Sequence, residues 1–229
     1  MNCAHVIGKK DKKPSKHKST RRSFKYYLNE RIKQKNMEQL SETSAELIQL
    51  VRIENANLTI LQLLDNADSR YIRDLKVNLS NALQSTTLSE KETALVALAI
   101  ASNQKNNALV LGLRKLASEK DASLEEQNEA ISCTSLLAGN NVFYRFRHFQ
   151  QKESYNAMQA KIKMNIMMKP VLGKELFELI SLVVSAVNGC EMCVNAHEHS
   201  VKELGASEER VWDAIRLASV IVSLDKVLN

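Results

Sequence analysis

The scarcity of residues that interrupt a helix is the strongest constraint in this sequence. Only six glycines and two prolines occur among 229 residues, and so few helix breakers are typical of a chain of successive helices. Aromatic residues make up 5% of the chain, whereas residues with high helix propensity, such as alanine, leucine and glutamate, are frequent. We therefore expect an all-α protein.

The positive net charge of the chain comes from its N-terminus. Residues 1–36 hold 12 lysines and arginines against two acidic residues, whereas the remainder holds 20 basic and 24 acidic residues. We predict a disordered basic tail over residues 1–36 and a helical domain over residues 37–229. A nucleic-acid or membrane-surface arm is the alternative interpretation of the tail, but a solvated segment is simpler, and we expect neither partner.

No long apolar run and no apolar N-terminal segment occurs in the sequence. We therefore expect no membrane span, no secretory signal and a cytoplasmic location. Four cysteines in such a chain do not indicate a disulfide framework.

Helical patterns follow one another from Met37 onward, with short polar joints between them. Ser89 and Glu92 have the spacing of a capping box, and Ser207 precedes two acidic residues, so both serines are expected to begin a helix. A weak repeat at a shift of about 83–84 residues places KETALVALAIAS (91–102) over KELFELISLVVS (174–185), which predicts duplicated helical units. The predicted helices cover residues 38–52, 57–66, 68–84, 89–102, 105–118, 123–138, 140–149, 153–160, 173–187, 190–204 and 207–227.

The helix predicted over residues 173–187 is apolar on nearly every side, which is typical of a buried helix. Its polar exceptions, Glu178, Ser181, Ser185 and Asn188, are spaced so that they form one narrow stripe. A buried carboxylate must be paired, hydrogen-bonded or protonated. Glu178 is therefore a candidate general acid or base, although a carboxylate that only satisfies backbone groups or an arginine is an equal alternative.

Two cysteines and a histidine follow on the next predicted helix. Cys190, Cys193 and His197 lie at i, i+3 and i+7, on one helix face. If the two helices form an antiparallel hairpin, Ser181 faces His197, and Glu178 lies one turn further on, within reach of a side chain or one water. A helix N-terminus and a nearby imidazolium both lower the pKa of a thiol, and cysteines three apart can close a disulfide reversibly. The pattern indicates a dithiol redox site.

Other interpretations of the same residues stay open. A zinc site would need a fourth ligand, which Glu178 or His199 could supply, and a buried structural cysteine pair is also possible. Cys133 lies in an apolar run and is expected in the core, and Cys3 has no comparable surroundings. We interpret His148 and His199 as surface or packing residues. A cysteine–histidine hydrolase would need an oxyanion site that the sequence does not suggest.

The stretch FELISLVVSAVNGCEMCVNAHEHS (177–200) resembles the signature of the alkylhydroperoxidase D family, within the carboxymuconolactone-decarboxylase-like superfamily. The family pattern is a glutamate, a cysteine twelve residues later, a second cysteine three later and a histidine four later. It falls on Glu178, Cys190, Cys193 and His197. The stretches YIRDLKVNLS (71–80), AGNNVFYRFRHF (138–149) and KMNIMMKP (163–170) are also similar to the family, and the resemblance covers about residues 60–225.

This resemblance implies an all-α fold of duplicated units that forms a homotrimer. It implies an antioxidant peroxidase that reduces organic hydroperoxides and regenerates a partner peroxiredoxin of the alkyl hydroperoxide reductase C type. The implied electron donor is dihydrolipoamide on a lipoyl-bearing protein, and no bound cofactor or metal is implied.

The resemblance also implies the role of each residue. Cys193 would be oxidised to the sulfenic acid and would form the mixed disulfide. Cys190 would be the proton donor and resolving thiol. Glu178 and His197 would relay protons. Relatives can carry a histidine just before the second cysteine, where this chain has Met192.

Two other functions compete with this one. The first is a non-enzymatic zinc-binding or thiol-sensing interaction module. The second is a decarboxylase-type enzyme of the superfamily, which the intact cysteine pair disfavours because that chemistry needs a base rather than a dithiol.

Overall fold

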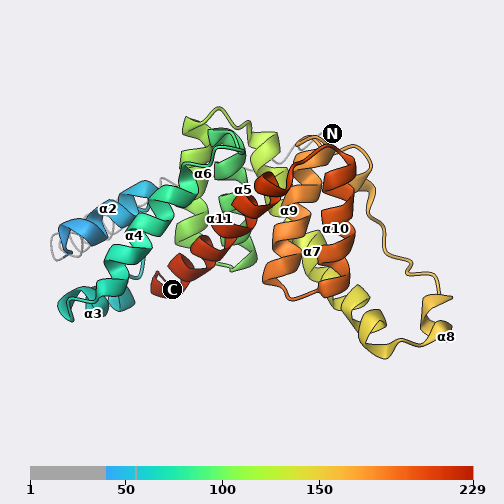
Figure 1. The fold of residues 1–229 in the computed structure, drawn as a ribbon. Coiled ribbons are helices and arrows are strands. Elements are labelled where there is room, and N and C mark those ends of the chain that lie inside the picture. Colours follow the sequence, from blue (N-terminus) through green and yellow to red (C-terminus); the bar gives the residue numbers. More distant parts are fainter. Residues whose placement is uncertain (1–39, 55, 229) are drawn as a thin grey trace, which may run out of the picture. The chain divides into compact units, whose positions relative to one another are not determined.

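The computed structural model describes residues 40–54 and 56–228, and every regular element within them is a helix (Figure 1). In this part of the chain, ten α-helices and one short 3₁₀-helix follow one another, so the predicted all-α fold is confirmed. The predicted basic tail lies outside the described residues. None of the described helices is long and apolar enough to cross a membrane. The elements are α2 (Glu42–Leu50), α3 (Thr59–Asn66), α4 (Arg70–Leu83), α5 (Glu90–Asn103), α6 (Asn107–Glu119), α7 (Leu124–Gln150), α8 (Glu153–Asn156), η1 (Asn165–Met167), α9 (Lys174–Val187), α10 (Glu191–Glu203) and α11 (Glu208–Val227).

Two sets of three helices repeat the same spacing along the chain. Each helix of the set α9–α10–α11 begins 84 residues after its counterpart in the set α5–α6–α7. The predicted duplication is therefore confirmed, and its shift is the larger of the two values that the sequence suggested. We call α5 and α6 the first hairpin, and α9 and α10 the second hairpin.

Serine side chains cap the N-termini of three of the repeated helices. Ser89 accepts a hydrogen bond from the backbone N–H of Glu92, and the Glu92 carboxylate accepts one from the N–H of Ser89, which completes the predicted capping box. Ser123 and Glu126 form the same box at the start of α7, and Ser207 caps α11 as expected. Local sequence signals therefore set these helix boundaries.

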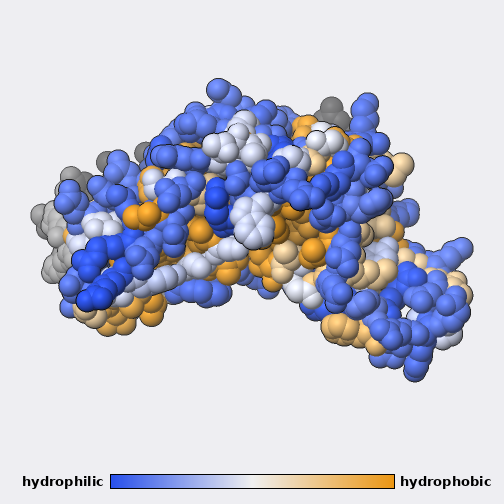
Figure 2. All heavy atoms as spheres, viewed as in Figure 1, coloured by the Kyte–Doolittle hydropathy of each residue, from blue (hydrophilic) through white to orange (hydrophobic). Residues whose placement is uncertain are grey.

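Helices α5 and α9 form the centre of the core. Residues 93–101 of α5 are all buried, and so are residues 179–185 of α9. The two helices contact each other, and both pack against α7 and α11. Helices α6 and α10 cover them from outside, each as the second arm of its hairpin. On the face shown in Figure 2 the surface is mostly hydrophilic, with apolar patches between the polar side chains.

Arg210 on α11 joins the two repeats. Its guanidinium donates to Glu175 of α9 at 2.8 Å and to Glu92 of α5 at 2.7 Å. The hydrogen bond to Glu175, followed by the bond to Glu92, raises the pKa of Arg210 further above its ordinary value. This cation therefore stays charged and holds α5, α9 and α11 together.

Three predicted helices differ from the structure. The predictions of separate helices over 123–138 and 140–149 were wrong, because α7 continues through Gly139 to Gln150. A glycine inside a helix costs only about 1 kcal/mol relative to alanine, and the burial of Asn140 and Asn141 beside it favours the unbroken helix. The helix predicted over 153–160 ends at Asn156. In Figure 1, α8 and the segment that follows it project beyond α9 and α10.

Candidate active site

The turn of the second hairpin sets the position of the cysteines. Gly189 has a φ of 68°, a left-handed conformation that glycine adopts without a steric penalty. The N–H of Cys190 then bonds to the carbonyl of Ser185 at 3.1 Å, which closes the end of α9 in the manner of a Schellman motif. Cys190 consequently occupies the N-cap position of α10.

Cys190 and Cys193 are joined by a disulfide across the first turn of α10. Their Cα atoms lie 5.3 Å apart, as the spacing of three residues on a helical turn allows. Cys190 is completely buried, whereas Cys193 retains 6% of its surface exposed. Of the two residues, only Cys193 retains any exposed surface.

Glu178 and His197 contact each other across the same hairpin. His197 Nδ1 lies 2.7 Å from Glu178 Oε2, and the two side chains are 13% and 18% exposed. When the carboxylate is ionised it only accepts hydrogen bonds, so Nδ1 then donates, and Nε2 has no hydrogen-bond partner among the described residues. His197 follows Cys193 by four residues and lies on the same face of α10. The structure thus places two pairs, Glu178 with His197 and Cys190 with Cys193, on the second hairpin. We refer to these four residues as the cluster.

The pairing of the two helices differs in detail from the predicted one. Ser181 was expected to face His197, but its hydroxyl donates to the carbonyl of Phe177 at 2.8 Å and lies 3.4 Å from the sulfur of Cys133. Glu178 takes the place opposite His197 instead. The rotation of a helix about its axis depends on the packing of its other faces, which a count of residues from the turn does not include.

A network of amides beneath the turn holds it in place. Asn188 donates to Asn141 Oδ1 at 2.8 Å and accepts from Asn103 at 2.9 Å. Asn141 donates in turn to Ser185 Oγ at 3.0 Å, and Arg145 donates to the carbonyl of Asn188 at 2.6 Å. The partners belong to α5 and α7, so helices of the first repeat support the residues just before Cys190 in the second. The sequence analysis missed this supporting role. Its available signal was the pair Asn141 and Arg145, two polar residues four apart on α7, of which Asn141 is buried.

The remaining cysteine and histidines lie outside the cluster. Cys133 is completely buried, as predicted, and desolvation raises the pKa of its thiol to about 12, so it stays protonated at neutral pH. His199 is exposed on α10, and His148 on α7 is partly exposed, 3.7 Å from Glu191. Met192 is exposed on the first turn of α10. Cys3 lies outside the described residues.

The zinc interpretation has no matching set of ligands in the described part of the chain. Among residues 40–54 and 56–228, no group of three histidines, cysteines or acidic residues is placed to hold a metal ion. In the disulfide form, Cys190 and Cys193 also present no thiolate, which is the form of cysteine that binds zinc.

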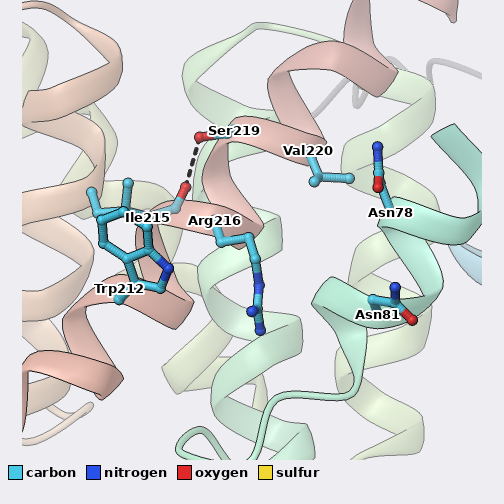
Figure 3. Close-up of a pocket in the computed structure, with 7 residues that line it drawn as sticks. All are labelled: Asn78, Asn81, Trp212, Ile215, Arg216, Ser219 and Val220. Carbon is cyan, nitrogen blue, oxygen red and sulfur yellow. Dashed lines mark hydrogen bonds between the residues drawn. The ribbon is translucent and has the colours of Figure 1, made fainter. Parts of the chain in front are cut away.

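Two hollows differ in their relation to the cluster. One of about 320 Å³ opens beside Glu178 and His199, where Met167, Pro170 and Lys174 form its rim. The other, of about 490 Å³, lies between α4 and α11, with Trp212 and Arg216 on one side and two asparagines on the other (Figure 3). The described residues that line this second hollow include no cysteine, histidine or carboxylate. The candidate site is therefore the second hairpin with the hollow beside Glu178.

Comparisons with known proteins point to the same region. The model of the carboxymuconolactone decarboxylase family matches residues 154–229. A protein named alkyl hydroperoxide reductase AhpD from Anaeromyxobacter dehalogenans strain 2CP-C is 41% identical over 150 residues, which cover 65% of this chain and 80% of that protein. Proteins of the same name from Solibacter usitatus and from Coxiella burnetii strain RSA 493 are 38% and 37% identical, over 74% and 69% of this chain and 95% and 90% of their own lengths.

Proposed function

This chain belongs to the alkyl hydroperoxide reductase AhpD family, within the carboxymuconolactone decarboxylase family, and on that premise we propose that it is a dithiol alkyl hydroperoxidase. The observation that carries the proposal is the Cys190–Cys193 disulfide at the start of α10, with the Glu178–His197 pair one helical turn away. A disulfide beside a proton carrier can accept two electrons from a dithiol and pass them to a peroxide.

The first half of the cycle reduces the disulfide. One thiolate of dihydrolipoamide attacks the sulfur of Cys193, the S–S bond breaks, and the sulfur of Cys190 leaves and takes a proton. The second thiol of the donor then displaces Cys193 from the mixed disulfide, which yields oxidised lipoamide and two protein thiols. The exposure of Cys193 and the complete burial of Cys190 support attack at Cys193.

The second half reduces the peroxide. His197, oriented by Glu178, takes the proton of Cys193, and the thiolate attacks the peroxide oxygen. The O–O bond breaks, Cys193 becomes a sulfenic acid, and the alkoxide takes the proton of Cys190 to leave as an alcohol. The Cys190 thiolate then attacks the sulfur of Cys193, hydroxide leaves and receives the proton from His197 as water, and the disulfide forms again.

Partners and assembly complete the proposal. The electron donor is a lipoyl-bearing protein, and a peroxiredoxin of the alkyl hydroperoxide reductase C type is a second acceptor of the electrons. The protein acts as a homotrimer in the cytoplasm. No bound cofactor is required, because the redox group consists of two side chains.

The variant Cys193→Ser tests the proposal. It should abolish turnover in an assay that couples dihydrolipoamide to an organic hydroperoxide, whereas the matched variant Cys133→Ser, which alters a buried thiol outside the cluster, should retain most of it. Mass spectrometry of the parent protein should find the Cys190–Cys193 disulfide after peroxide and two thiols after dihydrolipoamide. Unchanged turnover by Cys193→Ser would refute the proposal, and stoichiometric zinc with no peroxide turnover would favour the zinc module.

A further inference from the structure

Beyond residue 36, positive charge is concentrated in one segment next to the candidate site. Residues 143–174, which we call the basic arm, contain seven lysines and arginines and one acidic residue, Glu153. The rest of the chain after residue 36 contains 13 basic and 23 acidic residues. The arm comprises the end of α7, all of α8 and η1, and the first residue of α9. A basic segment within an otherwise acidic domain marks a candidate surface for an acidic partner.

The lysines of the basic arm are exposed and form no ion pair with another described residue. Of the seven other lysines that the structure describes, six form ion pairs with carboxylates. None of the arm lysines pairs with a carboxylate among the described residues, and all of them are exposed. Their positive charge is therefore not neutralised by carboxylates of the described residues and can attract a partner. They are Lys152, Lys161, Lys163, Lys169 and Lys174.

Exposed aromatic and methionine side chains lie among these charges. Phe149, Met158 and Met168 are 70%, 60% and 75% exposed. Aromatic residues and methionine are enriched in the buried centres of protein interfaces. The surface near α8 in Figure 2 accordingly shows both hydrophilic and apolar side chains. This composition suits a protein surface as the partner.

One end of the basic arm contacts residues next to Cys190, and the other end lies beside Glu178. At its start, Arg145 donates to the carbonyl of Asn188, two residues before Cys190, and His148 lies 3.7 Å from Glu191, one residue after it. At its end, Met167, Pro170 and Lys174 line the hollow beside Glu178. A partner held by the arm would therefore have its reactive group close to Cys193.

We propose that the basic arm docks an acidic protein surface that surrounds the lipoyl group of the electron donor. The inference rests on the proposed function and names the kind of partner that its reductive half uses. The structure holds the cysteine pair oxidised, which is the form that accepts electrons from a dithiol. Complementary charge raises the rate of association and fixes the orientation of the partner, whereas free dihydrolipoamide is neutral and gains nothing from the arm.

Three synthetic peptides provide the probe. Each carries one dihydrolipoyl-lysine, flanked by glutamates, by glutamines or by lysines, and free dihydrolipoamide serves as the uncharged reference. The rate of reduction of the Cys190–Cys193 disulfide is followed by rapid quenching and mass spectrometry. We expect the acidic peptide to react at least about tenfold faster than the neutral one at low salt, with the lysine peptide slowest. The difference should shrink as ionic strength rises.

A triple variant locates the effect. Lys152→Gln, Lys161→Gln and Lys163→Gln together should remove most of the preference for the acidic peptide and leave the rate with free dihydrolipoamide unchanged. The matched control combines Lys76→Gln, Lys115→Gln and Lys120→Gln, which remove the same charge at sites outside the arm, and it should keep the preference.

The outcomes separate this inference from the proposed function. Equal rates for the three peptides, or an undiminished preference in the arm variant, overturn the docking surface. The same holds if the arm variant loses only binding to anionic phospholipid vesicles or to nucleic acid, since the arm then serves that other partner. If free dihydrolipoamide fails to reduce the disulfide at all, the proposed function is wrong instead.

Discussion

The two hairpins share one backbone plan and differ in what their side chains do. Each has a fourteen-residue helix, a tight turn and a thirteen-residue helix. Lys105 in the first turn and Gly189 in the second have φ values of 62° and 68°. The N-cap residues that follow are Asn106 and Cys190, again 84 residues apart. The turn geometry therefore does not depend on the presence of the cysteine pair.

The side chains at equivalent positions show what changed. Ala94, Leu109 and Leu113 of the first hairpin are at most 1% exposed and belong to the core. Their counterparts 84 residues later are Glu178, Cys193 and His197, the proposed reactive set.

The N-cap position changed as well. Asn106 caps α6 by accepting from the N–H of Leu109, whereas Cys190 makes no side-chain capping bond within the described part of the chain. The second hairpin thus lacks apolar contacts and a helix cap that stabilise the first.

The largest expected effect comes from making the second hairpin resemble the first. His197→Leu places the residue type of Leu113 at the equivalent position, so the fold should tolerate it. Turnover of an organic hydroperoxide should fall about 10²–10⁴-fold, because the proposed proton carrier is lost. Steady-state kinetics with dihydrolipoamide measure turnover, and a thermal unfolding curve measures stability. Nearly parental turnover of the variant would contradict the proposed difference between the two hairpins.

The converse change should affect stability alone. Leu113→Ala removes a completely buried side chain from the first hairpin and should lower the free energy of unfolding by about 2–5 kcal/mol. Urea denaturation measures the loss. Leu111→Ala on the same helix is the control, since Leu111 is 68% exposed and its loss should cost at most about 0.5 kcal/mol. Equal losses in the two variants would contradict a purely structural role for the first hairpin.

A close approach of backbones distinguishes α6 from α10. An added Cβ at Gly112 would collide with the carbonyl oxygen of Val51, while the equivalent residue of α10 is the exposed Ala196. Gly112→Ala should therefore destabilise the fold by about 1–3 kcal/mol in urea denaturation. Gly139→Ala is the control, because an added Cβ there meets no described atom within 4 Å. It should stabilise α7 by about 0.5–1 kcal/mol. If both variants change the free energy of unfolding in the same direction, the close approach at Gly112 is contradicted.

Much of the fold could be predicted because its signals are local. Ser89 and Ser207 mark helix starts through hydrogen bonds within a single turn, and the apolar stretch of α9 indicates burial without knowledge of its neighbours. The break expected near Gly139 was wrong for the opposite reason. Gly139 is only a weak helix-breaking signal, and the packing of Asn140 and Asn141 against other helices outweighs it. No local sequence pattern contains that packing.

The candidate site follows the same division. The spacing of Cys190, Cys193 and His197 along one helix could be predicted, because helix geometry fixes it. The expected contact of Glu178 with His197 is confirmed. Which residue lies directly opposite His197 depends on how α9 is rotated against α10, and the expectation of Ser181 there was one turn in error. The support of Asn188 by Asn103 and Arg145 joins residues from three helices, and only tertiary structure brings these together.

The smallest expected effect concerns the helix starts. At the third position of α7, Glu126 closes a capping box, whereas the equivalent residue of α11 is Arg210, which reaches Glu92 in the first repeat. Burial opposes ionisation of Glu92, but hydrogen bonds from Arg210 and Ser89 outweigh it and hold the pKa of Glu92 below its ordinary value of 4.5. The stabilisation from a carboxylate with a lowered pKa is complete above pH 4.5 and is lost as the pH falls through the folded-state value.

Glu92→Gln should therefore lower the free energy of unfolding by about 1 kcal/mol at pH 7, and its difference from the parent should shrink as the pH falls toward 3. Urea denaturation at pH 7, 5 and 3.5 measures this convergence. Glu90→Gln removes a 74% exposed carboxylate that pairs with Lys120, and it should change stability by less than about 0.5 kcal/mol at each pH. If the loss of unfolding free energy depends on pH in the same way for both variants, Arg210 does not link the repeats through an ionised Glu92. Arg210 at the start of α11 would then have no linking role that Glu126 at the start of α7 lacks.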